Sequence, residues 1–135
     1  MVGSRASIAT TEAETSPVVR EKMIEARSSD TVRSKARSGK PNRQLKSDWN
    51  AAWDSPSSPG ALPLPLQPLI SVPAMTRVAR AAEAGSKPAK DLLTYESGQG
   101  VGMINAVRSA TAVVQEFKED FARAFEQFVS AVSGE

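Results

Sequence analysis

The side chains that could do chemistry are limited in type. Among the 135 residues there is no cysteine and no histidine, so the ligands of most transition-metal sites and the commonest general base at neutral pH are missing. Carboxylates, lysines, hydroxyls and a single tyrosine, Tyr95, remain, and none of them follows a recognisable catalytic spacing. These residue types predict a non-enzymatic protein with no cofactor, no metal and no small-molecule substrate.

The glycine-rich run from Ser97 to Gly102 invites comparison with phosphate-binding loops. Such loops need glycine because backbone N–H groups must close around an anion. Here no Lys-Ser or Lys-Thr pair ends the run, and the following residues keep a helical pattern instead of returning to a strand. We therefore interpret residues 97–102 as a glycine-rich hinge.

Positive charge is concentrated in one stretch of the chain. Between residues 27 and 46, seven basic residues face one acidic residue, Asp30. Such a cluster can bind nucleic acid through its phosphates, or it can serve as a localisation signal or a solvated arm. Phosphorylation of the serines among these residues would cancel the charge. The basic patch consists of Arg27, Arg33, Lys35, Arg37, Lys40, Arg43 and Lys46.

Both tryptophans follow this patch in a short polar segment. Leu45, Trp49 and Trp53 are spaced by four residues, so a helix capped by Ser47 would present them on one side. Two indoles in a chain poor in aromatic residues indicate a linear motif for a partner's groove, or a surface that packs on the C-terminal helix. We expect the two indoles to be exposed to water.

The elements that must position these residues are clearest near the C-terminal end. From residue 101 to 132, apolar residues recur at steps of three and four, which predicts a long amphipathic helix carrying all four phenylalanines. The flanking positions are mostly apolar too, so the buried face is too wide for a two-stranded coiled coil. We expect this face to bind a protein partner, a second copy or a membrane surface through Met103, Val107, Val114, Phe117, Phe121, Phe125 and Phe128.

The rest of the chain carries few signals of a core. Residues 1–60 contain seven Leu, Ile, Val or Phe, against eleven in residues 101–132, too few to offset an ordering cost of about 1–2 kcal/mol per residue. Helix signals cover 17–27, where Ser16 and Pro17 suit the start, and 74–84. Six of the nine prolines lie within 56–73, which favours an extended linker.

These patterns predict a mostly disordered chain with α-helical segments and no sheet. A basic arm with the tryptophan motif spans 1–55, a proline-rich linker 56–73, and a helical region 74–135. The predicted function is a non-enzymatic interaction or adaptor protein that docks or self-associates through its C-terminal helix. The alternatives are nucleic-acid association through residues 27–46 and peripheral membrane anchoring by the helix. Without a signal peptide or an apolar span, we expect an intracellular protein, cytoplasmic or nuclear.

Overall fold

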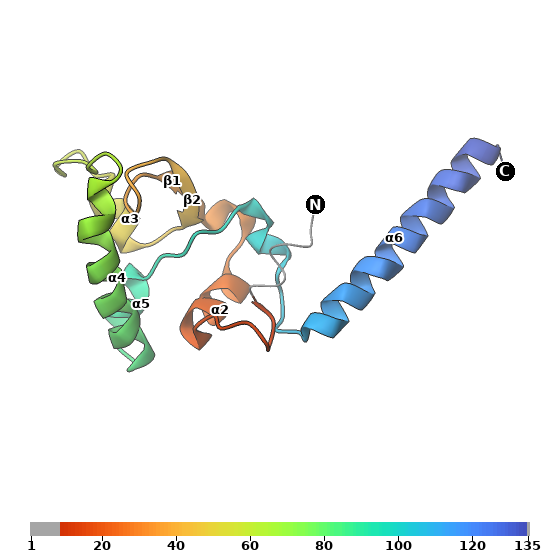
Figure 1. The fold of residues 1–135 in the computed structure, drawn as a ribbon, viewed down its shortest axis with the longest axis horizontal. Coiled ribbons are helices and arrows are strands. Elements are labelled where there is room, and N and C mark those ends of the chain that lie inside the picture. The colour runs from red at the N-terminus through yellow and green to blue at the C-terminus, as the bar shows by residue number, and fades with distance from the viewer. Residues whose placement is uncertain (1–8, 135) are drawn as a thin grey trace.

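The computed structural model describes residues 9–134, which form a folded body from which one long helix projects (Figure 1). The predicted fold class is therefore wrong, because these residues hold five α-helices and a sheet in place of widespread disorder. In chain order the elements are α2 (Pro17–Glu25), the 3-10 helix η2 (Ser28–Asp30), β1 (Thr31–Ser34), β2 (Asn42–Leu45), α3 (Asp48–Trp53), α4 (Leu66–Glu83), α5 (Lys87–Leu92), the 3-10 helix η3 (Gln99–Met103) and α6 (Ala110–Ser133).

The sheet consists of two short antiparallel strands, β1 and β2, whose register pairs Thr31 with Leu45 at one end. Residues 94–97 run along the other edge of β2, where the Leu45 N–H donates to the Tyr95 carbonyl at 2.9 Å. Each strand is four residues long and mostly polar. Strands this short carry no readable alternation of apolar and polar residues, so the sequence pattern did not predict them.

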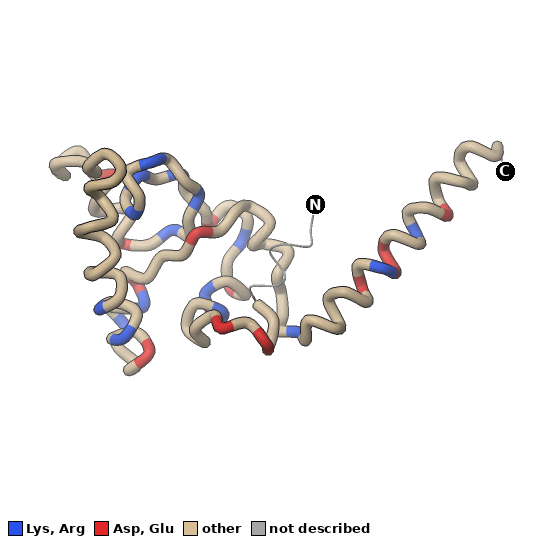
Figure 2. The backbone as a smooth tube through the Cα atoms, viewed as in Figure 1, with Lys and Arg blue, Asp and Glu red and all other residues tan. Residues whose placement is uncertain are grey.

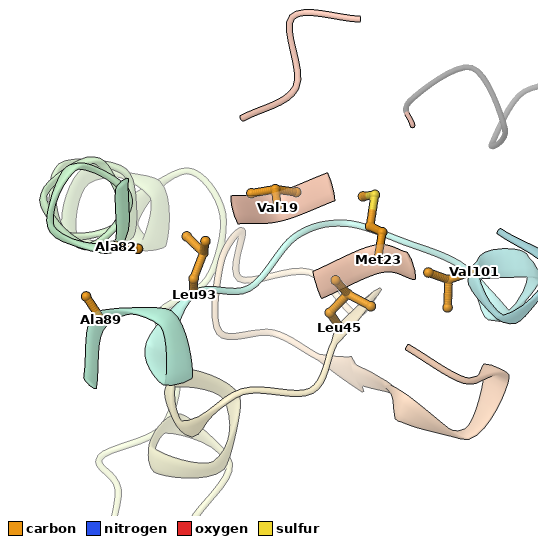
Figure 3. Close-up of a cluster of buried hydrophobic side chains, with 7 residues drawn as sticks. All are labelled: Val19, Met23, Leu45, Ala82, Ala89, Leu93 and Val101. Atoms are coloured by element: carbon orange, nitrogen blue, oxygen red, sulfur yellow. The ribbon is translucent and has the colours of Figure 1, made fainter. Parts of the chain in front are cut away.

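A small hydrophobic core joins α2 to the sheet and to α4 and α5 (Figure 3). Two of its seven buried residues are alanines, whose small side chains let the helix backbones approach closely. The helix predicted over 17–27 is present as α2, and it supplies two core residues. The buried cluster comprises Val19, Met23, Leu45, Ala82, Ala89, Leu93 and Val101.

Helix α4 begins eight residues before the start predicted for the 74–84 helix, inside the expected proline linker. Pro68 is compatible with this start because it lies in the first turn, where backbone N–H groups have no intrahelical partner. Pro73 lies within the helix. Gln67 and Ser71 are buried on one side of α4. Their tertiary contacts stabilise the first half of this helix, although proline disfavours helix locally.

The C-terminal helix α6 begins at Ala110, whereas the predicted helix began at residue 101. The Ser109 hydroxyl caps it by accepting from the Ala112 N–H at 3.2 Å. Met103 and Val107 therefore lie outside the helix, and no residue of α6 is buried. Within residues 9–134, no helix combines the length and apolar character needed to cross a membrane.

Candidate functional site

A charged cleft opens where α2, α3 and α5 come together. This cleft is a shallow depression, wide open to solvent, with a volume of ≈ 520 Å³, and two cations and two carboxylates line it. Opposite charges at this density can orient a polar or charged group and exchange protons with it. The lining residues are Lys22, Lys46, Ser47, Asp48 and Asp91.

Lys22 is the most perturbed group in this cleft. Its ammonium donates to the Lys90 carbonyl at 3.0 Å and to the Leu93 carbonyl at 2.5 Å, at the C-terminal end of α5 where the helix dipole favours a cation. Partial burial lowers the pKa of Lys22, and the negative charges of Asp91 and Asp48 oppose that shift. An ammonium has three N–H donors, so one remains after the two carbonyls are satisfied.

A chain of buried hydrogen bonds leads from the cleft into the sheet. The Ser47 hydroxyl donates to Asn50 Oδ1 at 2.8 Å, and Asn50 Nδ2 donates to Gln44 Oε1 at 2.9 Å. Gln44 Nε2 then donates to the Ser34 carbonyl at 3.2 Å. Because Asn50 and Gln44 are both buried, this chain fixes the start of α3, which carries Ser47 and Asp48 into the cleft.

The turn between β1 and β2 is held rigidly against α4. Gln67 Nε2 donates to the Ala36 carbonyl at 2.8 Å, and the Ser71 hydroxyl donates to the Arg37 carbonyl at 2.5 Å. Gly39 adopts a φ of +79°, and a Cβ there would lie 2.3 Å from the Leu62 carbonyl oxygen. The basic segment that was expected to be disordered is therefore a hairpin, whose turn is held by hydrogen bonds to α4 and by close packing on Leu62.

The predicted basic patch is spread along this hairpin and its flanks (Figure 2). Arg33 and Arg43 face each other directly across the ladder, and Arg43 Nη1 donates to the Thr31 hydroxyl at 3.0 Å. In the part of the chain that the structure describes, no carboxylate forms an ion pair with any patch residue. Arg27 precedes η2, Lys46 lines the charged cleft, and Lys35, Arg37 and Lys40 lie in the turn.

The tryptophan motif is divided between the core and α3. The predicted helix with a Ser47 cap is confirmed, since the Ser47 hydroxyl accepts from the Asn50 N–H. Leu45 precedes the helix and is buried in the core. Trp49 and Trp53 are half-buried, with ring centroids 5.9 Å apart, and Trp49 Nε1 donates to the Ala36 carbonyl at 3.3 Å. The indoles thus lie beside the β1–β2 turn and not on α6.

The glycine-rich run forms η3 and packs closely on η2. A Cβ at Gly102 would lie 2.6 Å from the Ser28 nitrogen, so this contact requires glycine. The adjacent Val101 is completely buried. The interpretation of residues 97–102 as a hinge stays a prediction.

The residues that sequence reasoning missed are single polar side chains without a periodic signal. Lys22, Gln44, Asn50 and Gln67 come from four different elements. The partners of Lys22 and Gln67 lie far away in the sequence, so only the tertiary fold shows their contacts. In residues 9–134, no group of three or more Asp or Glu side chains is arranged to hold a metal ion.

This chain is similar to a longer known protein. It is 45% identical over 114 residues, 84% of its length, to a Mycobacterium tuberculosis protein named as a putative monooxygenase, and it covers 30% of that protein. The chain thus spans less than a third of this relative. No family model matches the sequence.

Two solved structures resemble the fold. FabK from Thermotoga maritima matches with a TM-score of 0.63 and 20% identity, over 92% of this chain and 37% of FabK. A mutant of the same protein matches with a TM-score of 0.57 and 21% identity, over 92% of this chain and 33% of the mutant. At these identities the likeness shows a shared fold.

These comparisons overturn the prediction of a non-enzymatic adaptor. The finding that overturns it is the name of the relative, which is that of an enzyme. A nucleic-acid partner for the basic patch and a membrane surface for the C-terminal helix stay predictions. The expected partners of the C-terminal helix and the expected lack of a cofactor stay predictions.

Proposed function

We propose that this chain forms part of an oxygen-dependent oxidoreductase of the monooxygenase class. The observation that carries this proposal is the 45% identity over 114 residues to the Mycobacterium tuberculosis protein. Enzymes of this class insert one atom of O₂ into a substrate and reduce the other to water with two electrons from a reductant.

The charged cleft is the surface by which we propose that the chain contributes to such an enzyme. Lys22 retains one N–H donor, and partial burial lowers its pKa and so makes its proton easier to release. Asp48 and Asp91 on the same cleft supply acceptors. These groups suit the orientation of a polar substrate and proton exchange with it.

A chimera tests the proposed function. In it, the matched segment of the Mycobacterium tuberculosis relative is replaced by this chain. Oxygen uptake and transfer of ¹⁸O from ¹⁸O₂ into product are first measured for the relative, across a panel of reductants and small organic substrates. The chimera is then assayed with the best pair, and we expect it to consume O₂ and to place one ¹⁸O atom in the product.

The cleft is tested in the same chimera with Lys22→Met, and Lys40→Met on the exposed β1–β2 turn is the matched control. We expect the first substitution to lower the rate and the second to leave it unchanged. A chimera that folds but consumes no oxygen where the relative does would contradict the proposed function.

A further inference from the structure

Helix α6 presents a continuous apolar face that nothing in residues 9–134 covers. Phe121 and Phe128 are 68% and 65% exposed. At 100° per residue, the exposed large apolar side chains of the helix fall within about 120° of its circumference. A contiguous patch of this kind marks an interaction site, unlike scattered exposed apolar residues. The α6 face consists of Val114, Phe117, Phe121, Phe125, Phe128, Val129 and Val132.

The helix is anchored at its root, so this face is presented in a fixed direction. The Thr11 N–H donates to the Arg108 carbonyl at 2.9 Å, and the Ala110 N–H donates to the Glu12 carboxylate at 2.9 Å. On the opposite side, Gln115 Nε2 donates to Glu119 Oε1 at 2.9 Å. That side is polar and suited to water, which leaves the α6 face as the docking surface.

We propose that the α6 face packs against the part of the larger enzyme fold that this chain does not span. The match to FabK covers 92% of this chain, and so it cannot leave the whole 24-residue α6 outside it. The matched segment is only 37% of FabK, so most of that fold consists of additional polypeptide. The inference rests on the proposed function, because it takes the partner from the larger enzyme.

The shape of the face favours this occupant over a second copy of the chain. A two-stranded helix pair buries a narrow seam and flanks it with charges, whereas the α6 face is about 120° wide at 100° per residue. A broad face fits a sheet or several helices. The remaining polypeptide of the larger fold offers such a surface.

Thiol protection tests the docking in the chimera described above. The chain has no cysteine, so Phe121→Cys places one reporter on the α6 face and Glu119→Cys places a matched control on the opposite side. Labelled peptides are quantified by mass spectrometry, which separates them from the relative's own cysteines. We expect the Phe121→Cys thiol to react at least about tenfold more slowly in the chimera than in the isolated chain, and Glu119→Cys to react equally in both.

A second arm removes the apolar contacts without weakening the helix. Phe121→Ala with Phe128→Ala keeps high helix propensity, and Gln115→Ala with Gln127→Ala is the control on the polar side. We expect the first pair to lower the melting temperature of the chimera but not that of the isolated chain, and the control pair to lower neither.

Equal Phe121→Cys reactivity in both contexts would overturn the docking proposal. Protection that appears in the isolated chain and grows with concentration would also overturn it, in favour of a second copy. Protection in a chimera that consumes no oxygen would support docking and contradict the proposed function. Oxygen consumption without protection would support the proposed function and contradict docking.

Discussion

The ammonium of Lys22 links α2 to the end of α5 through two carbonyl oxygens. Lys22→Met keeps the length of the side chain but leaves both carbonyls without this donor. We expect the free energy of unfolding to fall by about 1–3 kcal/mol, as measured by urea denaturation. Lys40→Met on the exposed turn should change it by less than about 0.5 kcal/mol, and equal losses in the two variants would contradict this role for Lys22.

The lowered pKa of Lys22 also predicts a pH dependence of stability. Between its folded pKa and the unfolded value of 10.5, the unfolded state binds more protons than the folded state, so this contribution to stability rises with pH. Below the folded pKa the burial penalty is fully present. We therefore expect the stability of the wild type, relative to Lys22→Met, to improve as the pH rises towards 10.5. A constant difference across that range would contradict the burial of this ammonium.

Two glycines allow the effect of close packing to be separated from that of backbone conformation. Gly39 and Gly60 both have a φ of +79°, but a Cβ would clash with the Leu62 carbonyl only at Gly39 and would meet open space at Gly60. We expect Gly60→Ala to cost about 1–2 kcal/mol for the left-handed conformation, and Gly39→Ala to cost clearly more. Thermal unfolding of the two variants measures the difference. Equal costs would mean that the turn can move away from residue 62.

At the scale of elements, local periodicity predicted α2, the capped α3 and the amphipathic character of α6. These elements are visible in sequence because their signals lie within one or two turns of helix. The first half of α4 and the two strands were not predicted, because Gln67 holds the β1–β2 turn across 31 residues of chain. A buried glutamine looks like a surface residue in sequence.

The expectation of disorder failed for a related reason. It counted only large aliphatic and phenyl side chains as core material. The fold instead buries alanines, such as Ala82 and Ala89, together with amides such as Gln44 and Gln67 whose hydrogen bonds are satisfied. In the candidate site, the sequence singled out only Lys46, as part of the basic patch, and the Ser47 cap. Lys22 was missed because its two carbonyl acceptors lie 68 and 71 residues away along the chain.

The stabilisation of the β1–β2 hairpin by α4 can be measured by amide hydrogen exchange. Gln67→Met removes the donor to the Ala36 carbonyl and the acceptor for the Leu62 N–H. We expect amides within 36–40 to exchange faster in this variant, while those of α2 exchange at the wild-type rate. Loss of protection throughout the body would instead show that Gln67 supports the whole fold.

At the scale of the whole molecule, the hydrophobic core of the body is built without α6. No α6 residue is buried, and the core draws on none of them. Ending the chain after Ser109 should therefore leave cooperative unfolding of the body within about 0.5 kcal/mol of the full chain. Near-UV circular dichroism of Trp49 and Trp53 during denaturation would measure the unfolding of the body. Loss of cooperativity would show that α6 stabilises the body.

The anchoring of α6 has a mechanical consequence. Its root is bonded to Thr11 and Glu12, and the Arg20 guanidinium of α2 donates to the carbonyls of Ala13 and Thr15 at 3.3 and 2.9 Å. A load on α6 is therefore transmitted along residues 11–15 to α2, the helix that carries Lys22 into the charged cleft. By this connectivity α6 is placed like a lever arm on the helix that carries Lys22.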